Sequence, residues 1–183
     1  LVNSDSKIDA LVVGAGPTGL AMATELLRHG LNVRLIDAAE KPSTLSKAAV
    51  LMPRTLEEFQ SRGLHERTIA LGEKVHSFSS YFYNEIIFHA DYARVSSRYN
   101  YLLNIPQCDT ELILREELTR LDGKIEWRTH LEEFTDHGSH VTTHLTLPDG
   151  SRETLAVPYL LGCDGAHSVV RHGIGAEFHG GSY

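Results

Sequence analysis

The loop Gly14-Ala15-Gly16-Pro17-Thr18-Gly19 constrains the fold of this chain more than any other feature. It follows residues 9–13, a short run rich in Val and Leu that is typical of a buried parallel strand. After the loop, apolar residues recur at helical spacing; Pro17 suits the first turn of that helix and Gly30 its end. Residues 32–36 then form a second apolar run, so the sequence predicts a β-α-β unit.

A glycine loop between a strand and a helix is suited to binding a pyrophosphate, because free backbone N–H groups and the helix dipole both favour negative charge there. Gly14 permits the tight turn, Gly16 lets the backbone approach the phosphates, and Gly19 lets the helix pack on the sheet. Asp37, at the end of the second strand, can accept hydrogen bonds from ribose hydroxyls. The candidate nucleotide-binding residues of this unit are Gly14, Gly16, Pro17, Thr18, Gly19 and Asp37.

The loop alone does not choose between FAD and NAD, and that choice depends on the residues downstream. Residues 124–128 predict a third parallel strand, and residues 131–157 predict an antiparallel meander punctuated by glycine turns. A simple NAD-dependent dehydrogenase would have a parallel strand and a helix in place of that meander, so it is disfavoured. Residues 159–163 return as an apolar strand before a short helix.

Composition excludes several classes of partner. Seventeen Lys and Arg stand against 24 Asp and Glu, a formal charge of -7 without a basic cluster, so we expect no nucleic-acid or membrane partner. Cys108 and Cys163 lack disulfide or metal-ligand spacing, and with no signal peptide or membrane span in the sequence we expect a cytoplasmic protein. His140 and His144 would share a strand face near His137, but no Cys or carboxylate stands at ligand spacing, so no metal site is expected.

Four segments together resemble the class A flavoprotein aromatic hydroxylases, the group of para-hydroxybenzoate, phenol and polyketide hydroxylases. The resemblance covers almost the whole chain. Its segments are residues 13–20, residues 46–57 from Ser46-Lys47-Ala48 to Glu57, Ile105-Pro106-Gln107 with Glu111 and Leu114, and residues 162–168 with Arg171. The last two segments are far more specific than the first.

The resemblance implies FAD as the cofactor and adds five candidate contacts. Asp164 would lie beside the FAD pyrophosphate, with the Arg171 guanidinium bracing its loop, and the amide of Gln107 would reach the ribityl region. Lys47 stands where the family commonly has Arg, so it keeps the charge but loses bidentate geometry. Leu131 would offer its backbone to the adenine.

The expected fold is α/β: a Rossmann-like FAD-binding domain, with a parallel sheet and an antiparallel meander, and an inserted partial antiparallel sheet of a substrate domain. Residues 1–74 and 105–183 are predicted to form the first domain and residues 75–104 the insertion, where aromatic residues occur in extended stretches. The unpaired edges of the inserted strands would invite homodimerisation.

The activity implied by the resemblance is hydroxylation of a phenolic or aromatic substrate with NADH or NADPH as electron donor and O2. No catalytic residue is identifiable, and the family's Gly-Asp segment is not present, so we expect the chain to be incomplete and inactive alone. Two alternatives stay open: another FAD oxidoreductase of the same fold, such as a flavin halogenase or prenyl reductase, or a non-catalytic nucleotide-binding module.

Overall fold

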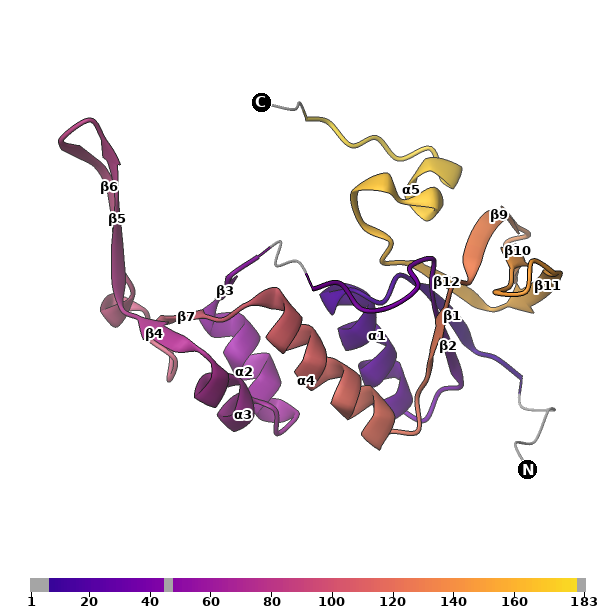
Figure 1. Ribbon diagram of the computed structural model, residues 1–183, viewed down its shortest axis with the longest axis horizontal. Coiled ribbons are helices and arrows are strands. Elements are labelled where there is room, and N and C mark those ends of the chain that lie inside the picture. The colour runs from indigo at the N-terminus through magenta and orange to yellow at the C-terminus, as the bar shows by residue number, and fades with distance from the viewer. Residues whose placement is uncertain (1–6, 45–47, 181–183) are drawn as a thin grey trace. The chain divides into compact units, whose positions relative to one another are not determined.

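The computed structural model describes residues 7–44 and 48–180. Contacts divide the chain into two compact units, residues 1–42 with 114–183, and residues 43–113 (Figure 1). The segment 75–104, predicted as an insertion, lies within the second unit. Its assignment to a substrate domain stays a prediction.

A four-stranded parallel sheet organises the first unit, in the order β12-β1-β2-β8. Its strands are β1 (Ala10–Val13), β2 (Val33–Asp37), β8 (Ile125–Trp127) and β12 (Tyr159–Gly162). Helix α1 (Pro17–Arg28) connects β1 to β2, as predicted, and lies beside these two strands in Figure 1. All four β1 residues are buried, which is typical of a strand covered on both faces.

The predicted meander is confirmed as a three-stranded antiparallel sheet, β11-β10-β9. Its strands are β9 (His130–Asp136), β10 (Val141–Thr146) and β11 (Arg152–Val157). Alternate residues of the parallel sheet pack against it and against α5 (Val169–Gly173). The shared core consists of Leu11, Val13, Ile36, Leu131, Leu145, Val157 and Val170.

Helix α4 (Gln107–Arg120) begins directly after Pro106. The Pro106 carbonyl accepts hydrogen bonds from the amides of Asp109 and Thr110, at 3.0 and 3.3 Å. The helix is therefore already established at Gln107. In the first unit, its C-terminal part contacts α1 through an ion pair between Glu117 and Arg28.

The second unit contains helices α2 (Pro53–Ser61) and α3 (His65–Leu71). The same unit contains an antiparallel sheet in the order β3-β7-β4. Its strands are β3 (Val50–Leu51), β7 (Leu102–Asn104) and β4 (Glu73–Val75). A core of Leu56, Tyr99, Tyr101, Leu103 and Ile105 supports this unit.

A separate two-stranded hairpin, β5 (Ser77–Phe82) and β6 (Glu85–Asp91), projects from this unit and is followed by η1 (Tyr92–Arg94) (Figure 1). Its apolar side chains are unusually exposed, with Tyr83 88% and Ile87 63% accessible. A two-stranded hairpin is marginally stable by itself. Exposed apolar side chains grouped in this way are typical of an interaction surface. Within the part of the chain that the structure describes, no helix has the length and apolarity of a membrane span.

Candidate functional site

The two glycine turns predicted from sequence meet at the ends of adjacent strands. Gly14 follows β1 with φ +100°, and a Cβ atom there would lie 2.4 Å from the Cys163 carbonyl oxygen. The Cys163 amide in turn donates to the Val13 carbonyl at 2.8 Å. Only glycine fits this combination of left-handed backbone and close approach. The Gly14 and Asp164 turns therefore form one surface, because β1 and β12 are paired in parallel.

The other two loop glycines have opposite surroundings. A Cβ atom on Gly19 would lie 1.7 Å from the Gly14 carbonyl oxygen, so Gly19 is required for the helix to start this close to the strand. A Cβ atom on Gly16 would meet no atom within 4 Å. Gly16 is the residue directly before α1, and as a glycine it has no side chain to cap the helix. Its missing side chain leaves open space in front of a helix N-terminus.

Asp37 links the end of β2 to the glycine loop. Its Oδ2 accepts a hydrogen bond from the Ala15 amide at 2.6 Å, and its Oδ1 accepts one from the Ala39 amide at 2.7 Å. A carboxylate has about four lone-pair sites, so each oxygen can accept a second bond from a hydroxyl. Asp37 can thus hold the loop and a ligand at the same time.

Asp164 organises the second turn, which continues into η2 (Gly165–His167). Its carboxylate accepts hydrogen bonds from the Ser168 hydroxyl at 2.5 Å and the Val169 amide at 2.7 Å. The Arg171 guanidinium contacts the Asp164 loop, as predicted, but through one nitrogen rather than a planar fork: its Nη1 donates to the Gly165 carbonyl at 3.4 Å.

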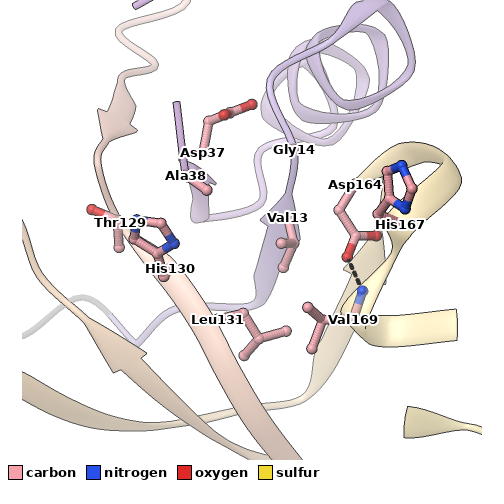
Figure 2. A pocket seen from close by; sticks show the side chains of 10 residues that line it. All are labelled: Val13, Gly14, Asp37, Ala38, Thr129, His130, Leu131, Asp164, His167 and Val169. Carbon is pink, nitrogen blue, oxygen red and sulfur yellow. Dashed lines mark hydrogen bonds between the residues drawn. The ribbon is translucent and has the colours of Figure 1, made fainter. Parts of the chain in front are cut away.

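A pocket of about 220 Å³ lies over these strand ends (Figure 2). Its apolar part comes from Val13, Leu131 and Val169. Figure 2 shows Asp37 and Asp164 on opposite sides, with Gly14 between them. The full lining consists of Val13, Gly14, Asp37, Ala38, Thr129, His130, Leu131, Asp164, His167 and Val169.

The pocket brings together four of the residues singled out from sequence, Gly14, Asp37, Leu131 and Asp164. The rest of the loop, namely Gly16, Pro17, Thr18 and Gly19, starts α1 directly beyond Gly14 and does not line the pocket. Sequence reasoning missed the lining side chains of Thr129, His130 and His167. His167 belongs to the resembling segment 162–168, whereas the sequence signal for Thr129 and His130 is their proximity to Leu131.

Two further predicted contacts belong to the segment 43–113. Gln107 belongs to the second unit, where its Nε2 donates to Glu111 Oε1 at 2.7 Å and its backbone amide to the Ala48 carbonyl at 3.1 Å. The predicted unit of Gln107 and Glu111 is thus a direct side-chain contact. Lys47 lies outside the described residues.

Cys163 sits between the two turns with a half-buried thiol. Burial, and secondarily the neighbouring Asp164 carboxylate, raise the pKa of this thiol above its ordinary value. Among the described residues, no cluster of three or more His, Cys, Asp or Glu could hold a metal ion. The site offers backbone amides, carboxylates and imidazoles for a polar organic ligand.

Comparison with known proteins identifies the ligand class. Residues 7–183 match the FAD binding domain family, which is nearly the whole chain. The chain belongs to the FAD binding domain family. It is 39% identical to 6-methylpretetramide 4-monooxygenase of Streptomyces rimosus over 172 residues, covering 93% of this chain and 31% of that protein. It is 31% identical to pentachlorophenol 4-monooxygenase of Sphingobium chlorophenolicum, covering 94% of this chain and 32% of that protein.

The fold of this FAD binding domain is also found in solved hydroxylases. The crystal structure of p-nitrophenol 4-monooxygenase from Pseudomonas putida DLL-E4 superposes with a TM-score of 0.87 at 27% identity, covering 97% of this chain and 46% of that one. These relatives confirm the resemblance to flavoprotein aromatic hydroxylases. The chain spans about a third of the length of the curated relatives, 31% and 32%.

The residues present fit the adenosine diphosphate half of FAD. Gly16 leaves a space that a Cβ atom would fill, which suits phosphate oxygens approaching the backbone. Asp37 retains lone pairs for ribose hydroxyls, and Leu131 contributes apolar surface to the pocket. No side chain of the pocket carries a permanent positive charge, so the backbone amides supply the attraction for phosphate.

Proposed function

We propose that this chain holds the adenosine diphosphate half of FAD at the paired Gly14 and Asp164 turns, within a flavoprotein monooxygenase that hydroxylates an aromatic or phenolic substrate. The single observation that carries the proposal is the meeting of Gly14 with the Cys163 carbonyl, beside the pocket that Asp37 also lines. If Gly14 served only to turn the chain, no second turn would have to pack against it.

In this proposal the pyrophosphate lies at Gly16, Pro17, Thr18 and Gly19, whose backbone begins α1. Asp37 receives the ribose hydroxyls, and its negative charge opposes a 2′-phosphate at this position. Asp164 and Arg171 shape the second turn. Gln107 and Lys47 are proposed as contacts to the ribityl chain and the pyrophosphate.

The isoalloxazine of bound FAD would supply the redox chemistry, with NADH or NADPH as donor and O2 as the source of the oxygen atom. The chain's own residues bind and orient the adenosine half of the cofactor. The aromatic substrate is proposed from the relatives' names, two of which specify 6-methylpretetramide and pentachlorophenol.

The test is a titration of the 15N-labelled chain with ADP and with FAD, observed by amide chemical shifts. We expect the largest shifts at Gly14, Gly16 and Gly19. Gly16→Ala should fold normally, because its φ is −73° and its surroundings are open, but it should weaken ADP binding at least tenfold by blocking the approach to the backbone.

Gly180→Ala is the matched control, since Gly180 is equally open and does not line the pocket. It should leave ADP binding unchanged. Shifts scattered over the surface, or equal ADP affinity of Gly16→Ala and the unaltered chain, would exclude this site.

The proposal includes self-association of the 183-residue chain through the β5–β6 hairpin. That hairpin pairs with no further strand in the described residues, and Phe82 and Ile86 are 64% and 58% exposed. Light scattering after size exclusion should show a concentration-dependent dimer that Ile86→Lys abolishes. A monomer at all concentrations would contradict this.

A further inference from the structure

The second side of the pocket is formed by a segment held against the end of β2. The Arg128 amide donates to the Ala39 carbonyl at 2.9 Å, and the Thr129 amide donates to the Asp37 carbonyl at 3.1 Å. The chain then enters β9 at His130. These bonds fix residue 130 next to the carboxylate proposed to bind ribose.

Alternation along this segment directs the imidazole of His130 away from the core. Thr129 is 2% exposed and Leu131 6% exposed, whereas His130 between them is exposed. Successive side chains of an extended segment point to opposite faces. Figure 2 shows the His130 ring on the side of Ala38 and Thr129, across the pocket from His167 and Asp164.

The His130 ring makes no hydrogen bond, ion pair or ring contact with the residues that the structure describes. Imidazole offers a planar ring with one donor and one acceptor in its neutral form. Nothing in the fold uses these groups, although the backbone on both sides of the ring is firmly held. The ring is thus pre-positioned and available to a ligand.

The order of the ligand groups follows from the proposed function. The pyrophosphate lies at the glycine loop and the ribose at Asp37, so the base extends past Asp37 to the side where Figure 2 shows Ala38, Thr129 and His130. A purine there would have apolar surface from Leu131 and a planar ring from His130.

We infer that His130 recognises the adenine base of the cofactor by ring stacking, and thereby sets the preference for an adenine dinucleotide. This inference rests on the proposed function. It assigns a base-selecting residue that the sequence pattern did not indicate.

The test compares ADP with UDP, which has the same ribose and diphosphate but a smaller base. Dissociation constants come from amide-shift titrations of the unaltered chain, His130→Ala, His130→Phe and the control His140→Ala. His140 is exposed on the turn between β9 and β10 and does not line the pocket.

We expect His130→Ala to weaken ADP binding about tenfold and UDP binding much less, because stacking between a base and an aromatic side chain is lost. His130→Phe should retain most of the ADP affinity, and His140→Ala should match the unaltered chain. A structural role for His130 would instead reduce both affinities equally and would not be rescued by Phe.

Equal losses for the two nucleotides, or unchanged ADP affinity in His130→Ala, overturn this inference and leave the proposed function intact. If the unaltered chain binds neither ADP nor UDP, both fall together. The two failures are therefore distinguishable.

Discussion

Oδ2 of Asp37 accepts a hydrogen bond from the backbone amide of Ala15 at 2.6 Å, joining the end of one parallel strand to the turn that follows its neighbour. The bond uses the carboxylate proposed to receive ribose, so the proposed ribose site and the phosphate loop are directly connected by a hydrogen bond. Asp37 is in this sense a positioning residue as well as a ligand contact.

Removing this carboxylate should loosen the loop before it affects any other part of the fold. In Asp37→Ala the Ala15 amide should exchange its hydrogen at least tenfold faster, and the free energy of unfolding should fall by about 1.5 kcal/mol, typical of a bond to a charged group. Asp37→Asn, whose amide oxygen can still accept, should retain part of the protection. Hydrogen exchange followed by NMR measures this, and equal Ala15 protection in Asp37→Ala would show that the bond is absent in solution.

Arg34 ties the parallel sheet to the meander. Its guanidinium donates to Glu126 of β8 at 2.6 and 2.9 Å and to Glu153 of β11 at 2.8 and 3.0 Å, with only 16% of its side chain exposed. The bond to Glu126 contributes most to raising the pKa of Arg34, and the bond to Glu153 acts in the same direction. Arg34→Lys keeps the charge but loses the planar guanidinium that bonds both glutamates. We therefore expect the free energy of unfolding, measured by urea denaturation, to fall by about 1 kcal/mol.

Arg54→Lys is the control for this substitution. Arg54 also bonds two glutamates, Glu57 and Glu58, but its side chain is 77% exposed. Exposed pairs contribute little to stability, so the free energy of unfolding should change clearly less in Arg54→Lys than in Arg34→Lys. Equal effects at the two arginines would contradict the structural role assigned to Arg34.

Glu117 should make the stability of the first unit depend on pH. Its side chain is 5% exposed, and hydrogen bonds from Arg120 and then Arg28 hold its pKa below the ordinary value. A lowered carboxyl pKa stabilises the fold at pH values above the unfolded pKa, roughly 4.3, and this contribution is lost as the pH falls through the folded pKa.

Glu117→Gln should therefore cost about 2 kcal/mol at pH 7, less than for a fully buried pair because Arg120 is 63% exposed. The difference from the unaltered chain should begin to shrink as the pH falls below the unfolded pKa, and it should disappear once the pH is below the folded pKa, where the native carboxylate is protonated as well. Denaturation curves at several pH values measure it; a difference that is the same at pH 3 and pH 7 would show that the charge is not responsible.

Cys163 should react slowly with alkylating reagents at neutral pH. Burial and the Asp164 carboxylate raise its thiol pKa, so less thiolate is present than in an ordinary cysteine of pKa about 8.5. In a Cys108→Ser background, the rate of iodoacetamide labelling should be measured as a function of pH. The pH at which this rate is half of its maximum should lie above about 8.5. A midpoint at or below that pH would mean that the thiol is better solvated than the structure indicates.

The sequence alone determined the elements that depend on local chemistry. Pro17, Gly30 and the apolar spacing between them predicted α1, and the glycine turns at 137–138 and 148–151 predicted the meander. Gly14 and Asp37 were predicted as site residues from their positions at strand ends beside a phosphate-binding loop, whereas Leu131 and Asp164 were implied by the resemblance to the aromatic hydroxylases.

Only the tertiary structure decided which of these residues share a pocket and what else lines it. His130 and His167 enter the pocket because the parallel pairing of β12, β1 and β2, and the bonds from residues 128–129 to the end of β2, bring distant turns together. The Asp37–Ala15 bond and the Arg171–Gly165 contact likewise depend on distances across the fold. Such contacts leave no periodic trace in a sequence, since they arise from strand register and side-chain direction rather than from spacing along the chain.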